Sequence, residues 1–268
     1  MALVLTGLAT AAIGSALLTG LRTYTRQMEH GQARADLRTA MAILTRELRG
    51  LDAGGNDIVE MAESSITYRA ARSTDFLCAQ PNLSAGTVVV SETPSVGLRQ
   101  LEAGRDSLLL LAEHDIADPN DDEWISAGLG GVSSGAVCPG GQAGFRLNLD
   151  GISAADLGGV YSGAPVIGFQ MTRILLYSGS DGRFWVGLRE FRPGTGWSIT
   201  QPIFGPVSRN GIRFRYYRTD GSVANNTTDV ARLSVEIVRV GRLPAGAHPA
   251  PVQDSLTIHV GLRNNPRI

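Results

Sequence analysis

The sequence predicts an α+β fold in which one long N-terminal helix is packed on an antiparallel, β-rich head. An uncharged apolar run opens the chain and continues into a polar segment that keeps a helical period. The remainder consists of short strand candidates and turns, and several of the strands alternate apolar with polar residues. Alternation of this kind is typical of antiparallel sheets with one face on a core, and it argues against a parallel α/β sheet. We therefore expect a helix over residues 1–52 and a head over residues 53–268.

The first half of the predicted helix has the composition of a membrane span. Residues 2–21 contain no charged side chain. About 20 residues at a rise of roughly 1.5 Å cross the hydrocarbon core of a bilayer. A cleaved signal peptide is the alternative. However, no Lys or Arg precedes the run, and the helical pattern continues past it instead of giving way to a small-residue cleavage region.

The second half of the helix is amphipathic. From Arg22 to Leu51 the composition turns polar and rich in Arg, while one apolar stripe persists. The residues of this stripe are Leu37, Met41, Leu44, Leu48 and Leu51. We predict that they pack against the head; a coiled-coil seam is the alternative, although the stripe lasts only about two heptads. The two halves together form one helix of about 50 residues, roughly 75 Å long.

The head is expected to be built from antiparallel strands. The predicted strands are Ser65–Ala70, Thr87–Ser91, Ser107–Ala112, Val166–Tyr177, Phe184–Phe191, Ile212–Tyr217, Ala231–Ile237 and Leu256–Leu262. The fourth and fifth flank a Gly-bearing turn and predict a hairpin. The region Asp115–Tyr161 is dominated by Gly, Ser, Ala, Asp and Asn, which predicts loops with one or two short elements.

Composition and motifs exclude several function classes. The chain has 268 residues and a formal net charge of -1, so it has no basic excess that would favour nucleic acid. It is long enough to bury a core without a metal or cofactor, and we expect neither cofactor nor nucleic-acid partner. The histidines are scattered, and neither a nucleophile elbow nor a phosphate loop is present. We therefore expect a protein that is not an enzyme.

Two groups of residues are candidates for cross-links or ligands. Cys78 and Cys138 lie outside any metal-ligand spacing, so we predict a disulfide if the head is exported and two buried thiols otherwise. The acidic segment after Asp115 is a weak calcium candidate, because calcium prefers several hard oxygens in a flexible loop. It lacks the spacing of an EF-hand, and an ordinary turn is the alternative. The candidate ligands are Asp118, Asn120, Asp121 and Asp122.

Four segments together resemble the type IV filament superfamily. The opening Met-Ala-Leu-Val-Leu-Thr-Gly-Leu-Ala-Thr-Ala is similar to the stretch that follows the family's prepilin start, and Arg22–Leu51, closing on Leu-Thr-Arg-Glu-Leu-Arg, is similar to the helix as it enters the head. Gly211–Gly221 resembles a strand and turn of the larger minor subunits, and Val260–Asn264 their closing strand. The combination resembles the W-type minor pilins and the J-type minor pseudopilins of type II secretion.

The resemblance implies a structural role. A minor pilin or pseudopilin helps to initiate or cap a type IV pilus or a type II secretion pseudopilus. It crosses the inner membrane once, holds its head in the periplasm, and meets other subunits through its N-terminal helix. The family's processing site, a Gly followed by Phe-Thr-Leu-x-Glu, is absent, so we expect the true start codon to lie upstream. Two alternatives are a tip adhesin or surface binding module that uses Asp115–Tyr161, and a membrane-anchored periplasmic enzyme.

Overall fold

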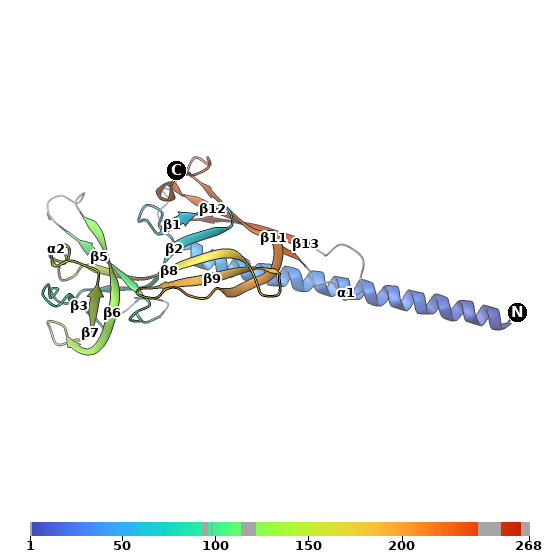
Figure 1. The fold of residues 1–268 in the computed structure, drawn as a ribbon, viewed down its shortest axis with the longest axis horizontal. Coiled ribbons are helices and arrows are strands. Elements are labelled where there is room, and N and C mark those ends of the chain that lie inside the picture. Colours follow the sequence, from blue (N-terminus) through green and yellow to red (C-terminus); the bar gives the residue numbers. More distant parts are fainter. Residues whose placement is uncertain (1, 93–95, 98, 114–121, 241–252, 264–268) are drawn as a thin grey trace.

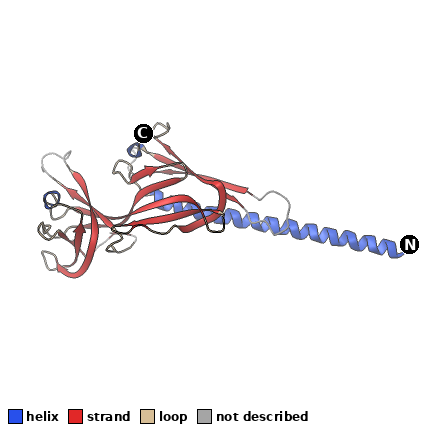
Figure 2. Ribbon diagram, viewed as in Figure 1, coloured by secondary structure: helices blue, strands red, loops and turns tan. Residues whose placement is uncertain are grey.

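The fold consists of one long helix that projects from a head made of strands (Figures 1 and 2). The computed structural model describes residues 2–92, 96–97, 99–113, 122–240 and 253–263, with the side chains of 2–11, 26 and 96 also left undescribed. Helix α1 spans Ala2–Arg49, and its N-terminus lies at the end of the molecule farthest from the head (Figure 1). The predicted α+β class, a long N-terminal helix with a large antiparallel β-sheet, is confirmed.

The head follows α1 as a series of strands with two short helical turns. Strands β8 and β9 form the hairpin that the sequence predicts. The elements are β1 (Ile58–Met61), β2 (Ser65–Phe76), β3 (Thr87–Ser91), β4 (Val96–Gly97), β5 (Ser107–Ala112), β6 (Glu123–Val137), β7 (Ala143–Asp150), α2 (Ala154–Leu157), β8 (Pro165–Ser178), β9 (Phe184–Arg192), β10 (Gly196–Trp197), β11 (Gln201–Tyr217), η1 (Thr227–Asp229), β12 (Arg232–Val240) and β13 (Gln253–Gly261).

The strands form one connected antiparallel sheet. Its main path runs β13-β12-β11-β9-β8-β5-β6-β7-β3. Strand β8 is the centre of the head, because β2 pairs along one of its edges while β9 and β5 share the other. Its residues 172–178 pair with β9, and its residues 166–169 pair with β5. The long strands β2 and β8 therefore run through both ends of the head.

The head encloses two hydrophobic cores. The first, which we call the helix-proximal core, joins α1 to the sheet and contains Leu44, Ile174, Phe214 and Val235. The second, the distal core, is formed by β3, β5, β6 and β7 with α2, and contains Leu108, Val88 and Leu147. In Figure 1 the strands of the distal core lie at the end of the head away from the projecting helix.

The apolar stripe of α1 lies in the helix-proximal core. Leu37, Met41, Leu44, Leu48 and Leu51 are each at most 3% exposed. Because side chains three or four residues apart share a helix face, one stripe can contact the sheet along several turns. Burial of each such side chain contributes about 1.5–3 kcal/mol. This stripe fixes the second half of α1 to the head.

The prediction for the middle of the chain is wrong. Much of the region predicted as loops forms the long strands β6 and β7. Two glycines of β6 lie beside side chains of β7: a Cβ on Gly130 would approach the Asp150 carboxylate, and one on Gly131 would meet the Asn148 side-chain amide at 2.7 Å. Glycine within a strand often marks such close approach, so a Gly-rich composition did not mean a loop here.

Candidate assembly surface

The first half of α1 extends beyond the head, and the apolar side chains described on it from Ile13 onward are exposed. The exposed fractions lie between 58% and 63% for Ile13, Leu17, Leu18, Leu21, Tyr24 and Met28. The first buried residue of the helix among those described is Ala33. Soluble proteins rarely expose a continuous apolar surface of this kind unless it contacts a membrane or another protein.

The serine and threonine hydroxyl groups described on this half of the helix bond to the helix itself. Ser15 Oγ donates to the Ala12 carbonyl oxygen at 2.9 Å, and Thr19 and Thr23 donate to the carbonyl oxygens four residues earlier at 2.8 and 2.9 Å. A hydroxyl that is satisfied by its own helix costs little when it enters an apolar environment. These serine and threonine residues are therefore compatible with burial in lipid or between helices.

Ion pairs hold the second half of α1 to the head. Asp36 lies 3.1 Å from Arg239 of β12, and Glu47 lies 3.3 Å from Arg72 of β2. His30 Nδ1 lies 3.1 Å from Asp254 Oδ2 of β13. The Glu47–Arg72 pair has only 15% and 11% of its side chains exposed, so water screens it weakly. These contacts fix the rotation of the helix on the sheet.

Two further ionisable groups lie near the end of α1. Tyr68 is fully buried, and its burial, with the Glu47 carboxylate as a second cause, raises the pKa of its hydroxyl. Asp57 accepts a hydrogen bond from the Asp52 N–H at 2.8 Å. Burial raises the pKa of Asp57 to about 6, although that hydrogen bond acts in the opposite direction. Both groups connect the end of the helix to the first strands.

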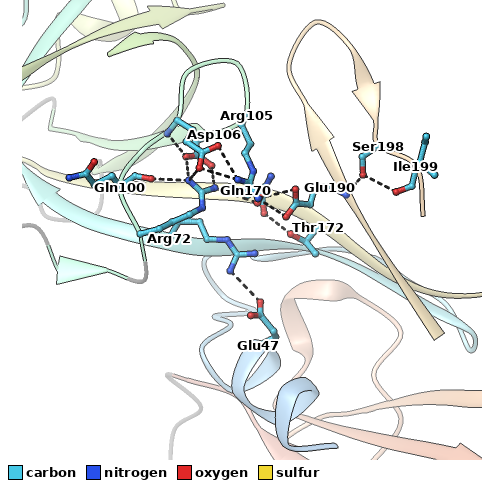
Figure 3. Close-up of polar contacts among 12 residues, drawn as sticks. Glu47, Arg72, Gln100, Arg105, Asp106, Gln170, Thr172, Glu190, Ser198 and Ile199 are labelled. Carbon is cyan, nitrogen blue, oxygen red and sulfur yellow. Dashed lines mark hydrogen bonds and ion pairs between the residues drawn. The ribbon is translucent and has the colours of Figure 1, made fainter. Parts of the chain in front are cut away.

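A polar cluster lies where the chain before β5 meets β8 and β9 (Figure 3). Arg99 Nη1 donates to Asp106 at 2.6 Å, and the side chain of Asp106 is fully buried. Arg105 bonds to Glu190 of β9 at 2.9 Å. Figure 3 shows Arg105, Asp106 and Glu190 beside Gln170 of β8. Paired buried charges of this kind favour one arrangement of the strands, because breaking a pair leaves a charge uncompensated.

The structure also places the other predicted site residues. The disulfide between Cys78 and Cys138 is confirmed, with an S–S distance of 2.03 Å. Of the calcium candidates, Asp118, Asn120 and Asp121 lie outside the described residues, and Asp122 is exposed. In the described ranges, no three His, Cys, Asp or Glu side chains lie together as a metal site.

The structure describes the side chains of only part of the predicted membrane segment. Where side chains are described, no helical stretch is both long and apolar enough to cross a membrane. The predicted segment 2–21 includes residues 2–11, whose side chains are not among those described.

The fold thus defines a class of molecule: a rod with an exposed apolar half and an antiparallel, two-core head fixed to its other half. Comparison with known proteins finds no matching family model, no matching curated protein and no matching solved structure.

Sequence reasoning did not find the ion pairs of α1. Its apolar stripe predicts which helix face meets the head, but the partners Arg72, Arg239 and Asp254 lie far along the chain on three different strands. A weak signal was present: Asp36 and Glu47 each lie next to a stripe residue, where an acidic group is close to the head. Naming their partners requires the strand order.

Proposed function

We propose that this chain is a minor subunit of the type IV filament superfamily, a minor pilin or pseudopilin, that helps to initiate or cap a pilus or a type II secretion pseudopilus. The first half of α1 holds it in the inner membrane, and the head lies in the periplasm. Its partners are other subunits, which it meets through the same helix. The role is structural, without catalysis or a cofactor.

The observation that carries this proposal is the exposed apolar half of α1. Leu17 and Leu21 are each 63% exposed on a helix whose other half is fixed in the head. Removing one large apolar side chain from water contributes about 1.5–3 kcal/mol, so several together strongly favour an apolar environment. Lipid supplies it before assembly, and the helices of neighbouring subunits supply it afterwards. The head then determines which neighbours fit.

The disulfide supports an exported head. Disulfides persist in oxidising compartments such as the periplasm and are rare in the cytosol. The Cys78–Cys138 bridge joins the end of β2 to the end of β6, within the part of the head farthest from the helix. A head exposed to the periplasm would keep this bridge.

The proposal is tested by placing charge on the exposed half of the helix. In the full-length chain, Leu17→Asp together with Leu21→Asp is expected to release the protein from membranes and to remove it from sheared filaments. The matched control is Leu83→Asp, because Leu83 is 45% exposed on the head. The control is expected to distribute as the unmodified chain does. A helix variant that stays in both fractions would contradict the proposal.

Deletion of the gene distinguishes the two filament types. A role in a pilus predicts loss of surface pili with normal protein secretion, and a role in the pseudopilus predicts the reverse. Restoring the intact chain is the control for both. Cells that keep both pili and secretion would contradict a role in either filament.

A further inference from the structure

Helix α1 carries a second stripe, opposite the buried one, which we call the outward stripe. In its first half the stripe is apolar: Ile13, Leu17, Tyr24 and Met28 follow at helical spacings and are all exposed. Gly20 completes this part, and a shallow groove around it is lined by Ile13 and Leu17. This part belongs to the surface already proposed to enter the membrane.

The outward stripe continues without interruption along the half of α1 that is fixed to the head. It passes through Gly31, Ala35 and Ala42, which are small and exposed. Small residues allow another helix to approach closely. Near the end of α1 a second shallow groove is lined by Ala42, Thr45, Arg46 and Arg49. At Gly31, Ala35 and Ala42 the outward stripe thus allows another helix to approach closely.

Charge is divided between the two sides of this half of the helix. The acidic residues Asp36 and Glu47 are turned to the head and paired with Arg239 and Arg72. The arginines of the outward stripe, Arg38, Arg46 and Arg49, are exposed. Within the described residues, none of these three arginines has a carboxylate within ion-pair distance.

Two of the outward arginines also repel each other. Arg46 and Arg49 are three residues apart, so they share one helix face. Like charges at this spacing destabilise a helix. A partner that brings carboxylates to this level would remove the repulsion and gain attraction.

We infer that the outward stripe binds one helix of a different subunit, apolar opposite residues 13–28 and acidic opposite Arg38, Arg46 and Arg49. This inference rests on the proposed function and names the chemistry of the partner. A second copy of this chain fits poorly, because in a parallel pair these arginines would face arginines. The acids Asp36 and Glu47 of such a copy are already held by its own head.

The partner is identified by cross-linking from the middle of the stripe. A photo-reactive amino acid replaces Ala42 in the full-length chain within cells that form the native assembly, and the adduct is mapped by mass spectrometry. We expect an adduct to a helix of another subunit that carries Asp or Glu at that level. The same amino acid at Thr257, exposed on β13, is the control and is expected to give a different pattern.

Charge variants test whether the arginines act through charge. Arg46→Glu with Arg49→Glu is expected to lower the adduct yield about tenfold, since attraction becomes repulsion. Arg46→Lys with Arg49→Lys keeps the charge and is expected to keep most of the yield. Thermal unfolding of each variant checks that the head is intact.

Several results would overturn the inference. They are an adduct between two copies of this chain, an adduct to lipid or to a non-helical or uncharged segment, no adduct at all, or a yield unchanged by charge reversal. If the unmodified chain is nevertheless found in the membrane and filament fractions, only the partner assignment fails. If the unmodified chain is absent from both fractions, the proposed function itself is contradicted.

Discussion

At the scale of single residues, burial raises the pKa of one carboxylate at the junction of helix and head, that of Asp57. Asp57 lies between α1 and β1, where its pKa is raised from 3.8 to about 6 by burial. The folded chain therefore holds this proton more tightly than the unfolded chain does. The stabilisation is fully present below about pH 4 and is lost as the pH rises through 6.

Asp57→Asn is expected to remove this pH dependence while keeping an acceptor for the Asp52 N–H. Between pH 4 and pH 7.5 the free energy of unfolding of the unmodified chain should fall by about 1–2 kcal/mol more than that of the variant. This figure is reduced from the full shift because Asp57 is partly exposed. Chemical denaturation at a series of pH values measures the difference. Parallel curves for the two chains would contradict the account.

The mostly buried ion pair of α1 is expected to matter far more than exposed ones. Arg72→Ala leaves Glu47 buried without its partner and should cost about 3 kcal/mol of the free energy of unfolding. Arg183→Ala, which breaks the exposed contact with Asp181, should cost less than about 1 kcal/mol. Urea denaturation compares them. Equal losses in the free energy of unfolding would show that Glu47 is not buried in an ion pair with Arg72.

At the scale of elements, one face of α1 is buried against the head and the opposite face is exposed. Leu44 is 1% exposed in the helix-proximal core, and its neighbour Ile43 is 40% exposed. Leu44→Ala is expected to cost about 2–5 kcal/mol of the free energy of unfolding, because it leaves a cavity between helix and sheet. Ile43→Ala should cost about 1 kcal/mol or less, since the side chain is only partly buried. Similar losses in urea denaturation would mean that α1 is rotated.

Some elements could be predicted from sequence because each has one solvent-exposed and one buried face. Strands β11, β12 and β13 alternate apolar with polar residues near Phe214, Val235 and Ile258, and the structure confirms them. Strand β6 could not be predicted in this way. Its Gly130 and Gly131 lie beside the Asp150 and Asn148 side chains of β7, and that contact depends on a pairing the sequence does not reveal.

At the scale of the whole molecule, the sequence predicted one head, and the structure shows a head with two cores joined by β2 and β8. The buried face of α1 could be predicted from its periodicity. The polar cluster around Asp106 could not, because its members Arg99, Arg105, Gln170 and Glu190 come together only when β5, β8 and β9 are aligned.

The disulfide is expected to stabilise mainly the distal core. It joins residues 60 apart, and closing a loop of that length restricts the unfolded chain by roughly 4 kcal/mol on the chain-entropy model. Replacing both Cys78 and Cys138 by Ser should therefore accelerate hydrogen exchange in β3, β6 and β7. Amides of β12 and β13 serve as the internal control and should change much less. An equal change throughout the head would show that the two cores unfold as one unit.

The account depends most on where the first half of α1 lies. Introduced cysteines report this directly, since both natural cysteines are in the disulfide. In cells whose outer membrane has been permeabilised, a charged, water-soluble maleimide should label Thr257→Cys on β13 and fail to label Leu17→Cys until the membrane is dissolved and the assembly dissociated. Equal labelling of both positions in untreated assemblies would contradict the account.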